Sequence, residues 1–212
     1  MAMSEEEIEA LKTPEYWDER YAKSDGKEPT HEWFRTYSDL EPFFQKHLFA
    51  KYDPAQCPKI LHLGAGDSTI PQDLLKRGYQ HQLCLDFSAV IVERMSEQKT
   101  DGLTWMCGDV RDMPAVEAAS IDVAFDKGTL DAMIHGSPWS PPDDVRENSA
   151  LYMKEVARTL KDSGAFLYIT YRQPHFVKPL LNQDNLWDMH METLGGENSF
   201  EYYAFVLKKA VH

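Results

Sequence analysis

From residue 58 onward, short apolar runs alternate with stretches of helical periodicity, and this alternation limits the possible folds more than any other feature. Such alternation is typical of βαβ units, in which parallel strands are joined by crossover helices. The expected strands are Lys59–Leu63, Gln82–Asp86, Leu103–Cys107, Ile121–Phe125 and Ala165–Thr170. The expected helices between them include Ile70–Arg77, Ala89–Gln98 and Val145–Leu160.

The two ends of the chain depart from this pattern. Near the C-terminus, the strand-like runs Leu186–Leu194 and Phe200–Lys208 flank the glycine-containing segment Gly195–Asn198, which predicts an antiparallel hairpin. Near the N-terminus, helical turns are expected within Glu5–Ala22 and Ser38–Phe49. We therefore expect an α/β fold with a Rossmann-like, mostly parallel sheet, a C-terminal antiparallel hairpin, helices on both faces and a helical N-terminal lead-in.

Length and charge narrow the class of protein. With 212 residues, 42% hydrophobic and 27% charged, the chain fits one ordered domain over 1–212, made of a helical lead-in (1–57) and an α/β core (58–212). The apolar runs are too short to span a bilayer and the first residues are acidic, so we expect a cytoplasmic protein. The net charge of −13 disfavours nucleic acid and membrane surfaces and favours a basic partner.

Metal and disulfide chemistry have little support in the sequence. The three cysteines, Cys57, Cys84 and Cys107, form no CxxC pair and are expected to be reduced thiols of the core. The histidines form no HExxH motif and no cluster with cysteine at ligand spacing, so no metal site is expected.

A glycine turn follows the first expected strand. Gly64 and Gly66 stand between that strand and the next helix, where an open α/β sheet binds nucleotide-like ligands. Thr69 occupies the third glycine position of the GxGxxG fingerprint, so the sequence does not specify a dinucleotide site. The turn alone is equally consistent with a simple strand-to-helix connection.

Two aspartates follow the next two strands. Asp86 ends the second strand, where its carboxylate could accept hydrogen bonds from both hydroxyls of a ribose. Asp109 follows the third strand, where a carboxylate or backbone amide could contact an adenine edge. Either residue alone could merely cap the following helix. Because parallel strands end at the same edge of a sheet, the glycine turn and both aspartates together indicate a nucleotide-like site.

With these motifs in place, the chain resembles the class I S-adenosylmethionine-dependent methyltransferases. Within that class it looks most like the methyltransferase-like protein-lysine methyltransferases of elongation factor 1-alpha, of the type linked to endothelin-converting enzyme 2. FDKGTLDAM is the most specific motif, whereas His62 departs from the acidic residue found there in many class I enzymes. The matching segments are Tyr16–Tyr21, Glu32–Phe34, Leu61–Ser68, Leu85–Met95, Gly108–Met113 and Phe125–Met133.

The resemblance implies S-adenosyl-L-methionine as cofactor, S-adenosyl-L-homocysteine as product, and a lead-in that covers the cofactor. Trp17 and Tyr21 lie four residues apart, on one helical face, and aromatic rings suit a sulfonium cation, although both could simply pack the lead-in on the sheet. Lys127 is expected to contact the cofactor through its backbone carbonyl, because two cations repel. The cofactor-binding residues expected from the resemblance and the glycine turn are Trp17, Tyr21, Trp33, Gly64, Gly66, Asp86, Phe87, Asp109, Val110 and Lys127.

The activity that the resemblance implies is methylation of a protein lysine, with elongation factor 1-alpha as the expected basic partner. Asp126, at the end of the fourth strand, is the candidate catalytic residue, because its carboxylate could orient the incoming ammonium. Capping of the turn Gly128–Ala132 is an equally good role for it. Three alternatives stay open: a small-molecule methyltransferase, a non-catalytic module that binds S-adenosylmethionine, and a nicotinamide dehydrogenase.

Overall fold

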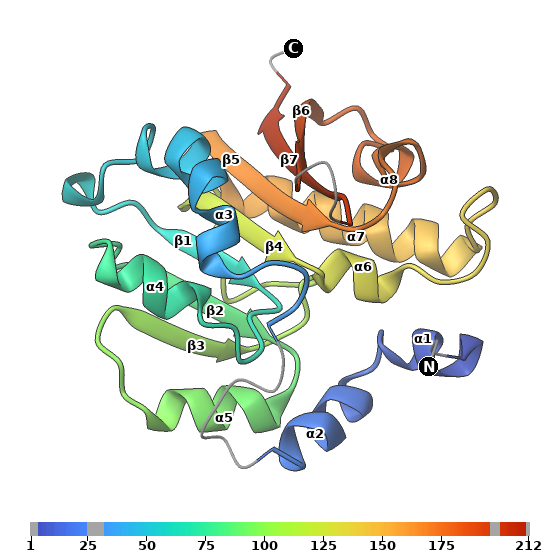
Figure 1. Cartoon of the computed structure of the whole chain (residues 1–212), viewed down its shortest axis with the longest axis horizontal. Coiled ribbons are helices and arrows are strands. Elements are labelled where there is room, and N and C mark those ends of the chain that lie inside the picture. Colours follow the sequence, from blue (N-terminus) through green and yellow to red (C-terminus); the bar gives the residue numbers. More distant parts are fainter. Residues whose placement is uncertain (1–3, 25–31, 196–199, 211–212) are drawn as a thin grey trace.

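The protein is built on one seven-stranded sheet, seen in a computed structural model that describes residues 4–24, 32–195 and 200–210 (Figure 1). The strand order is β3-β2-β1-β4-β5-β7-β6. The first five strands are parallel, β7 is antiparallel to β5, and β6 is antiparallel to β7. The expected mixed sheet is thus confirmed, although residues 196–199 of the expected hairpin turn lie outside the described part. The strands are β1 (Ile60–Leu63), β2 (Gln82–Asp86), β3 (Leu103–Cys107), β4 (Ile121–Lys127), β5 (Leu160–Thr170), β6 (Trp187–Leu194) and β7 (Tyr202–Lys209).

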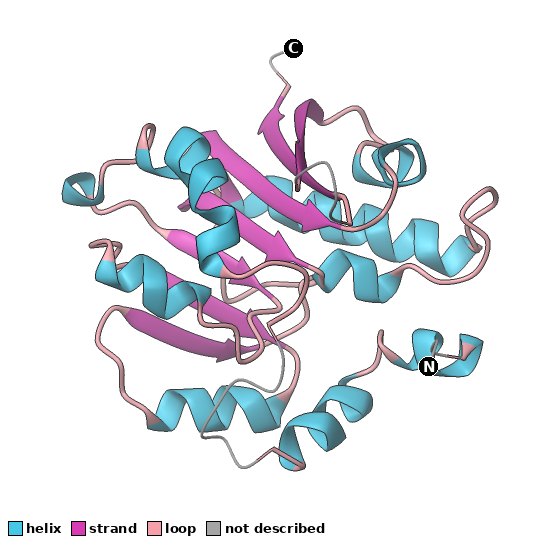
Figure 2. Cartoon of the chain, viewed as in Figure 1, coloured by secondary structure: helices cyan, strands magenta, loops and turns pink. Residues whose placement is uncertain are grey.

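Helices cover both faces of this sheet (Figure 2). One buried cluster joins α3, η1 and α4 to one face, and a second joins α6, α7 and α8 to the other. The lead-in helix α2 packs on α5 through a third, smaller cluster around Tyr21 and Ile91. The helices are α1 (Glu5–Ala10), α2 (Pro14–Ala22), α3 (Tyr37–Phe44), η1 (Gln45–Phe49), η2 (Pro54–Gln56), α4 (Ile70–Lys76), α5 (Ala89–Glu97), α6 (Thr129–Met133), α7 (Asp143–Thr159) and α8 (Pro174–Leu181).

Several elements differ from the sequence expectations. The segment expected as one helix over Ser38–Phe49 starts at Tyr37 and changes to a π-helix at Gln45. Strand β5 starts at Leu160, because Leu160 pairs with Ile121 before the chain bulges outward and pairing resumes at Ala165. Helix α8 was not expected, since its two prolines obscure the apolar stripe that it buries.

The prediction that all three cysteines lie in the core is wrong. Cys84 is buried in the central strand β2, but Cys57 and Cys107 are exposed. Cys107 ends β3, which is an edge strand and is only partly covered. Cys57 follows η2 in a left-handed turn at the surface.

The strand order creates a switch point between β1 and β4. The chain runs outward from β1 to β2 and β3, then returns to β4 on the other side of β1 and continues to β5. Ligands of open α/β sheets bind in the crevice beyond the carboxyl ends of strands at such a point. Helices α1 and α2 lie at this end of the sheet (Figure 1), and α1 contacts α6 there.

Candidate active site

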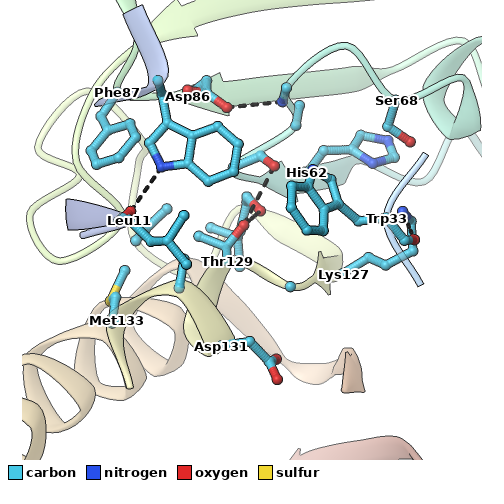
Figure 3. A pocket seen from close by; sticks show the side chains of 18 of the residues that line it. Leu11, Trp33, His62, Ser68, Asp86, Phe87, Lys127, Thr129, Asp131 and Met133 are labelled. Carbon is cyan, nitrogen blue, oxygen red and sulfur yellow. Dashed lines mark hydrogen bonds between the residues drawn. The ribbon is translucent and has the colours of Figure 1, made fainter. Parts of the chain in front are cut away.

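A cavity of about 360 Å³ lies at the carboxyl ends of the strands, between the sheet and the lead-in (Figure 3). In this view Asp86 and Phe87 lie on one side of Thr129, and Trp33 and Lys127 on the other. All ten residues expected to contact a cofactor line this cavity, so the structure brings together residues from six separate segments of the chain. They are Trp17, Tyr21, Trp33, Gly64, Gly66, Asp86, Phe87, Asp109, Val110 and Lys127.

The glycine turn after β1 requires glycine at both positions. Gly64 and Gly66 have φ angles of +64° and +54°, in the left-handed region that most side chains avoid. A Cβ atom on Gly64 would lie 2.1 Å from Oγ1 of Thr129, and one on Gly66 would lie 2.6 Å from the Tyr21 hydroxyl. Thr129 in turn donates a hydrogen bond to the Leu63 carbonyl at 2.8 Å. The turn is therefore packed against both the lead-in and the first residue of α6.

Asp86 presents a buried carboxylate at the end of β2. Its oxygens accept hydrogen bonds from the backbone N–H groups of Gly66 at 2.8 Å and Ser88 at 2.9 Å. Burial raises the pKa of Asp86 to about 6 despite these bonds. An ionised carboxylate has about four acceptor positions. Asp86 can therefore bind hydroxyl groups in the cavity while it keeps both backbone contacts.

Asp109, beyond the end of β3, is bound by its neighbour Arg111. The guanidinium donates to Asp109 from Nε at 2.9 Å and from Nη2 at 2.5 Å, and its Nη1 donates to Asn148 at 2.7 Å. Burial opposes ionisation, but the hydrogen bonds from Arg111 prevail and lower the pKa of Asp109. The carboxylate is therefore charged and held in place beside Val110 on the cavity wall.

Three aromatic residues of the lead-in cover the cavity. The ring centroid of Trp17 lies 5.9 Å from that of Tyr21 and 5.9 Å from that of Trp33. The Trp17 indole N–H donates to the Leu11 carbonyl at 2.7 Å, one of the hydrogen bonds drawn in Figure 3. This bond fixes the indole, so its ring forms a wall of the cavity. The i, i+4 face expected for Trp17 and Tyr21 is present in α2.

Lys127 is engaged through its side chain, which the sequence did not indicate. Its ammonium donates to the Glu32 carboxylate at 2.6 Å and to the Trp33 carbonyl at 2.6 Å. Glu32 also accepts from the Ser68 hydroxyl and the Thr69 N–H, both at 2.9 Å. Burial lowers the pKa of Lys127, and the Glu32 carboxylate opposes that shift. The pair fastens the segment that carries Trp33 to the glycine turn and to the end of β4.

The structure does not bring Asp126, the candidate catalytic residue, to the cavity wall. Asp126 is fully buried and absent from the cavity lining. It accepts hydrogen bonds from the N–H groups of Thr129 and Leu130 at 2.8 and 3.0 Å and from the Tyr152 hydroxyl at 2.8 Å. This placement fits the capping alternative, in which the carboxylate holds the first turn of α6. Direct contact between Asp126 and an amine has no support in this geometry.

Asp131 is a structurally important residue that the sequence analysis missed. It accepts hydrogen bonds at 2.6 Å from both the Tyr168 hydroxyl and the Thr170 hydroxyl of β5, and Arg172 lies 3.5 Å from it. The motif DKGTLDA therefore ties β4 to β1 through Thr129 and to β5 through Asp131. The unusual motif was itself the available signal, but the partners of its side chains could not be inferred without the sheet order.

Within residues 4–24, 32–195 and 200–210, no group of three or more histidine, cysteine, aspartate or glutamate side chains could hold a metal ion. None of the helices in these ranges is both long and apolar enough to cross a bilayer.

Sequence comparison places the chain in a known family. The Methyltransferase domain family matches residues 61–168, about half of the chain. EEF1A lysine methyltransferase 4 from Mus musculus is 30% identical over 198 residues, which cover 89% of this chain and 73% of that protein. The human eEF1A lysine and N-terminal methyltransferase is 30% identical over 77% of this chain, but over only 22% of its own length.

Solved structures share the fold at low sequence identity. A Leishmania major SAM-dependent methyltransferase aligns with a TM-score of 0.64 at 14% identity, over 97% of this chain and 91% of that one. The geranyl diphosphate C-methyltransferase of Streptomyces coelicolor A3(2), solved with S-adenosyl-L-homocysteine, aligns with a TM-score of 0.62 at 15% identity, over 99% of this chain and 100% of that one.

The cavity suits the cofactor of this family. The buried Asp86 carboxylate keeps acceptor positions for hydroxyl groups, the glycine turn admits a ligand close to the backbone, and the aromatic wall suits a sulfonium. The family match and the chemistry of these residues agree on S-adenosyl-L-methionine as the cofactor. The chain thus belongs to the Methyltransferase domain family, as a class I S-adenosylmethionine-dependent methyltransferase similar to the eEF1A lysine methyltransferases.

Proposed function

We propose that this protein is a protein-lysine N-methyltransferase that acts on elongation factor 1-alpha. The observation that carries the proposal is the 30% identity to EEF1A lysine methyltransferase 4, which extends over 89% of the chain. The net charge of −13 adds support, because an acidic enzyme attracts a basic protein surface. We further propose that the protein acts in the cytoplasm.

In this proposal the cofactor lies along the edge of the sheet. Asp86 binds the ribose hydroxyls, while Asp109 and Val110 contact the adenine beside Phe87. Gly64 and Gly66 let the cofactor approach the backbone, and the residues before 58 act as its lid. The aromatic rings of Trp17, Tyr21 and Trp33 and the end of β4 at Lys127 complete the enclosure.

The chemistry also requires an uncharged amine. When bound, S-adenosylmethionine supplies a methyl carbon on a cationic sulfur, which the lysine nitrogen attacks as the carbon–sulfur bond breaks and leaves its electron pair on sulfur. A free lysine has a pKa of about 10.4. Removal from water lowers this pKa, so the ammonium loses its proton to solvent as the side chain is enclosed. Alignment of the amine inside the cavity then supplies most of the rate.

Asp126 contributes indirectly to this alignment. Its carboxylate fixes the first turn of α6 through Thr129 and Leu130, and Thr129 packs directly against Gly64. We therefore assign Asp126 as a positioning residue for the glycine turn and the first turn of α6, in place of direct contact with the amine.

The test uses purified elongation factor 1-alpha and radiolabelled S-adenosylmethionine at several salt concentrations. We expect label on a lysine, with kcat/KM falling as ionic strength rises, because salt screens the attraction between an acidic enzyme and a basic surface. An Asp86→Ala enzyme serves as the inactive control, and mass spectrometry of the labelled protein identifies the residue.

Two outcomes would refute the proposal. Salt-independent methylation of a small amine or hydroxyl compound, without label on elongation factor 1-alpha, would favour the small-molecule alternative. Tight cofactor binding without transfer to any protein of a whole-cell extract would favour the non-catalytic alternative.

A further inference from the structure

Part of the cavity extends beyond the residues assigned to the cofactor. The ribose and adenine positions lie over the ends of β2 and β3, at Asp86 and Asp109, and the glycine turn lies over the end of β1. The remaining cavity wall lies on the opposite side, over β4 and β5, and includes Phe34, Gly128 and Tyr171. An acceptor group must approach from this side.

This side of the cavity is lined by aromatic rings. The ring centroid of Phe34 lies 5.4 Å from that of Tyr171, with the two planes at 70°, and 6.4 Å from that of Trp33. Tyr171 is 40% exposed although it also lines the cavity, so it forms part of the opening to solvent. Phe34 and Tyr171 therefore lie between bulk water and the interior of the site.

The backbone of Phe34 is held in an unfavourable conformation. Its φ angle is +61°, in the left-handed region that a bulky side chain rarely adopts. The adjacent anchor at Glu32 and the contact of the ring with Gly128 keep it there, and a Cβ atom on Gly128 would lie 3.1 Å from the ring. The strain is consistent with a ring placed for binding and not only for packing.

The cations near this wall are already paired. Lys127 is bound to Glu32, and Arg172 is bound to Asp131 and donates to the carbonyl of Ile134. Arg172 also lies over the ring of Tyr171, 5.2 Å from its centroid. The Phe34 ring also packs against Tyr202, with 5.6 Å between ring centroids, so Phe34 and Tyr171 offer a ligand the ring surface that lines the cavity.

We propose that Phe34 and Tyr171 form a subsite for the alkylammonium end of the acceptor, and that they recognise it by cation–π attraction. The proposal rests on the proposed lysine activity and specifies how that substrate is selected. Methyl transfer moves positive charge from sulfur to the amine nitrogen, as the bond described above forms and breaks. Aromatic rings beside that nitrogen stabilise the charge where it arrives, whereas a neutral hydroxyl or thiol acceptor gains less from them.

The experiment measures binding of two matched peptides to the full chain saturated with S-adenosylhomocysteine. Both are acetyl-Gly-Gly-X-Gly-Gly amides, in which X is Nζ-trimethyllysine or its neutral analogue with a tert-butyl group in place of the trimethylammonium. The two probes have the same shape and differ in charge. We expect NMR titration to show about 2- to 30-fold tighter binding of the cationic peptide.

Matched variants separate the aromatic effect from simple packing. Tyr171→Phe keeps the ring and should retain the preference for the cation. Tyr171→Leu and Phe34→Leu keep apolar bulk but lose the ring. Each should reduce the ratio of the affinities for the cationic and the neutral peptide toward one. Calorimetry should show unchanged affinity of Tyr171→Leu for S-adenosylhomocysteine, which verifies that the cofactor side is intact.

Several results would overturn the subsite. The unmodified enzyme could bind both peptides equally well, or bind neither of them. The preference for the cationic peptide could also survive in both leucine variants, with the affinity for the two peptides reduced by the same factor. The peptide preference does not depend on the identity of the protein substrate. If elongation factor 1-alpha is not methylated but the preference for the cationic peptide is present, the proposed substrate is wrong and the subsite stands. If elongation factor 1-alpha is methylated but neither peptide is preferred, the subsite is wrong and the proposed substrate stands.

Discussion

The ammonium of Lys127 at the end of β4 lies 2.6 Å from the carboxylate of Glu32, a residue of the lead-in 95 positions earlier. Both side chains are largely buried, with 5% and 15% of their surfaces exposed. Removal of one partner from such a pair leaves a buried charge without compensation. We expect Glu32→Ala to lower the free energy of unfolding by about 3–5 kcal/mol.

A double-mutant cycle tests this relationship. Glu32→Gln and Lys127→Met should each lower the free energy of unfolding measured in urea titrations. The double variant should lose less than the sum of the two single losses, because neither charge of the pair remains. The double variant should still bind S-adenosylmethionine more weakly, because Trp33 is no longer fastened to the site. Additive destabilisation would show that the two side chains act separately.

Binding of S-adenosylmethionine should depend on pH through Asp86. Burial raises the pKa of Asp86 to about 6, and the ionised form is the better acceptor for ribose hydroxyls. Affinity should therefore fall by up to about tenfold per unit as the pH decreases below 6. Calorimetry between pH 5 and 8 measures this fall, and Asp86→Asn should bind weakly with no such step.

Asp109→Asn provides the matched control for this profile. Arg111 keeps the pKa of Asp109 low despite burial, so Asp109 does not titrate in this range. The variant should lose affinity but retain the Asp86-dependent step. A step that persists in Asp86→Asn would assign the titration to another group.

Trp17→Ala should weaken cofactor binding by about tenfold without unfolding the sheet, because the indole belongs to the lid and not to the two main clusters of the core. Trp17→Phe should restore part of the affinity. Calorimetry and thermal melting of the three proteins measure both properties. A large decrease in melting temperature with unchanged affinity would mean that Trp17 serves only to pack the lead-in.

Asp126 should stabilise the fold most at low pH. Burial raises its pKa to about 7, while the unfolded chain has a value near 4. Between these values the folded state binds more protons than the unfolded state, so the contribution of Asp126 to stability decreases as the pH rises from about 4 to 7. The stability difference between the natural protein and Asp126→Asn, measured by urea unfolding at several pH values, should shrink accordingly.

Tyr152→Phe offers a control for that titration. In the natural protein, the Tyr152 hydroxyl donates to the Asp126 carboxylate and lowers the pKa of Asp126, and the substitution removes this hydroxyl. In Tyr152→Phe, the contribution of Asp126 to stability should therefore decrease at a higher pH than in the natural protein. A stability difference that does not change with pH would contradict the assignment to Asp126.

Local patterns in the sequence were sufficient to predict the parallel strands, the glycine turn, Asp86 and Asp109, whereas cavity-lining residues such as Trp33 and Phe87 were expected only from the resemblance to the methyltransferases. Each of the strands β1 to β4 has glycine or aspartate at its carboxyl end, as at Gly64 and Asp86, whereas β5 ends at Thr170. The strand order, which the structure supplies, creates the switch point at which these ends come together.

The long-range contacts of side chains could not be predicted in the same way. By local pattern alone, Glu32 does not differ from other acidic residues. Nothing in its neighbourhood indicates that its carboxylate pairs with the ammonium of Lys127. By sequence, Asp126 was the candidate catalytic carboxylate and Asp131 had no assigned role. Only the sheet and α6 show that each is bound by buried hydroxyl or backbone donors. Such partners depend on tertiary packing and not on local periodicity.

The segment from Asp126 to Asp131 has a consequence for how this enzyme can vary between species. Within six positions it caps α6, anchors the lead-in, packs against the glycine turn and binds β5. Residues that share contacts in this way have non-additive effects when they are exchanged. Substitutions here should be strongly epistatic, so a neutral replacement at one position will require matching changes at Glu32, at the glycine turn or in β5.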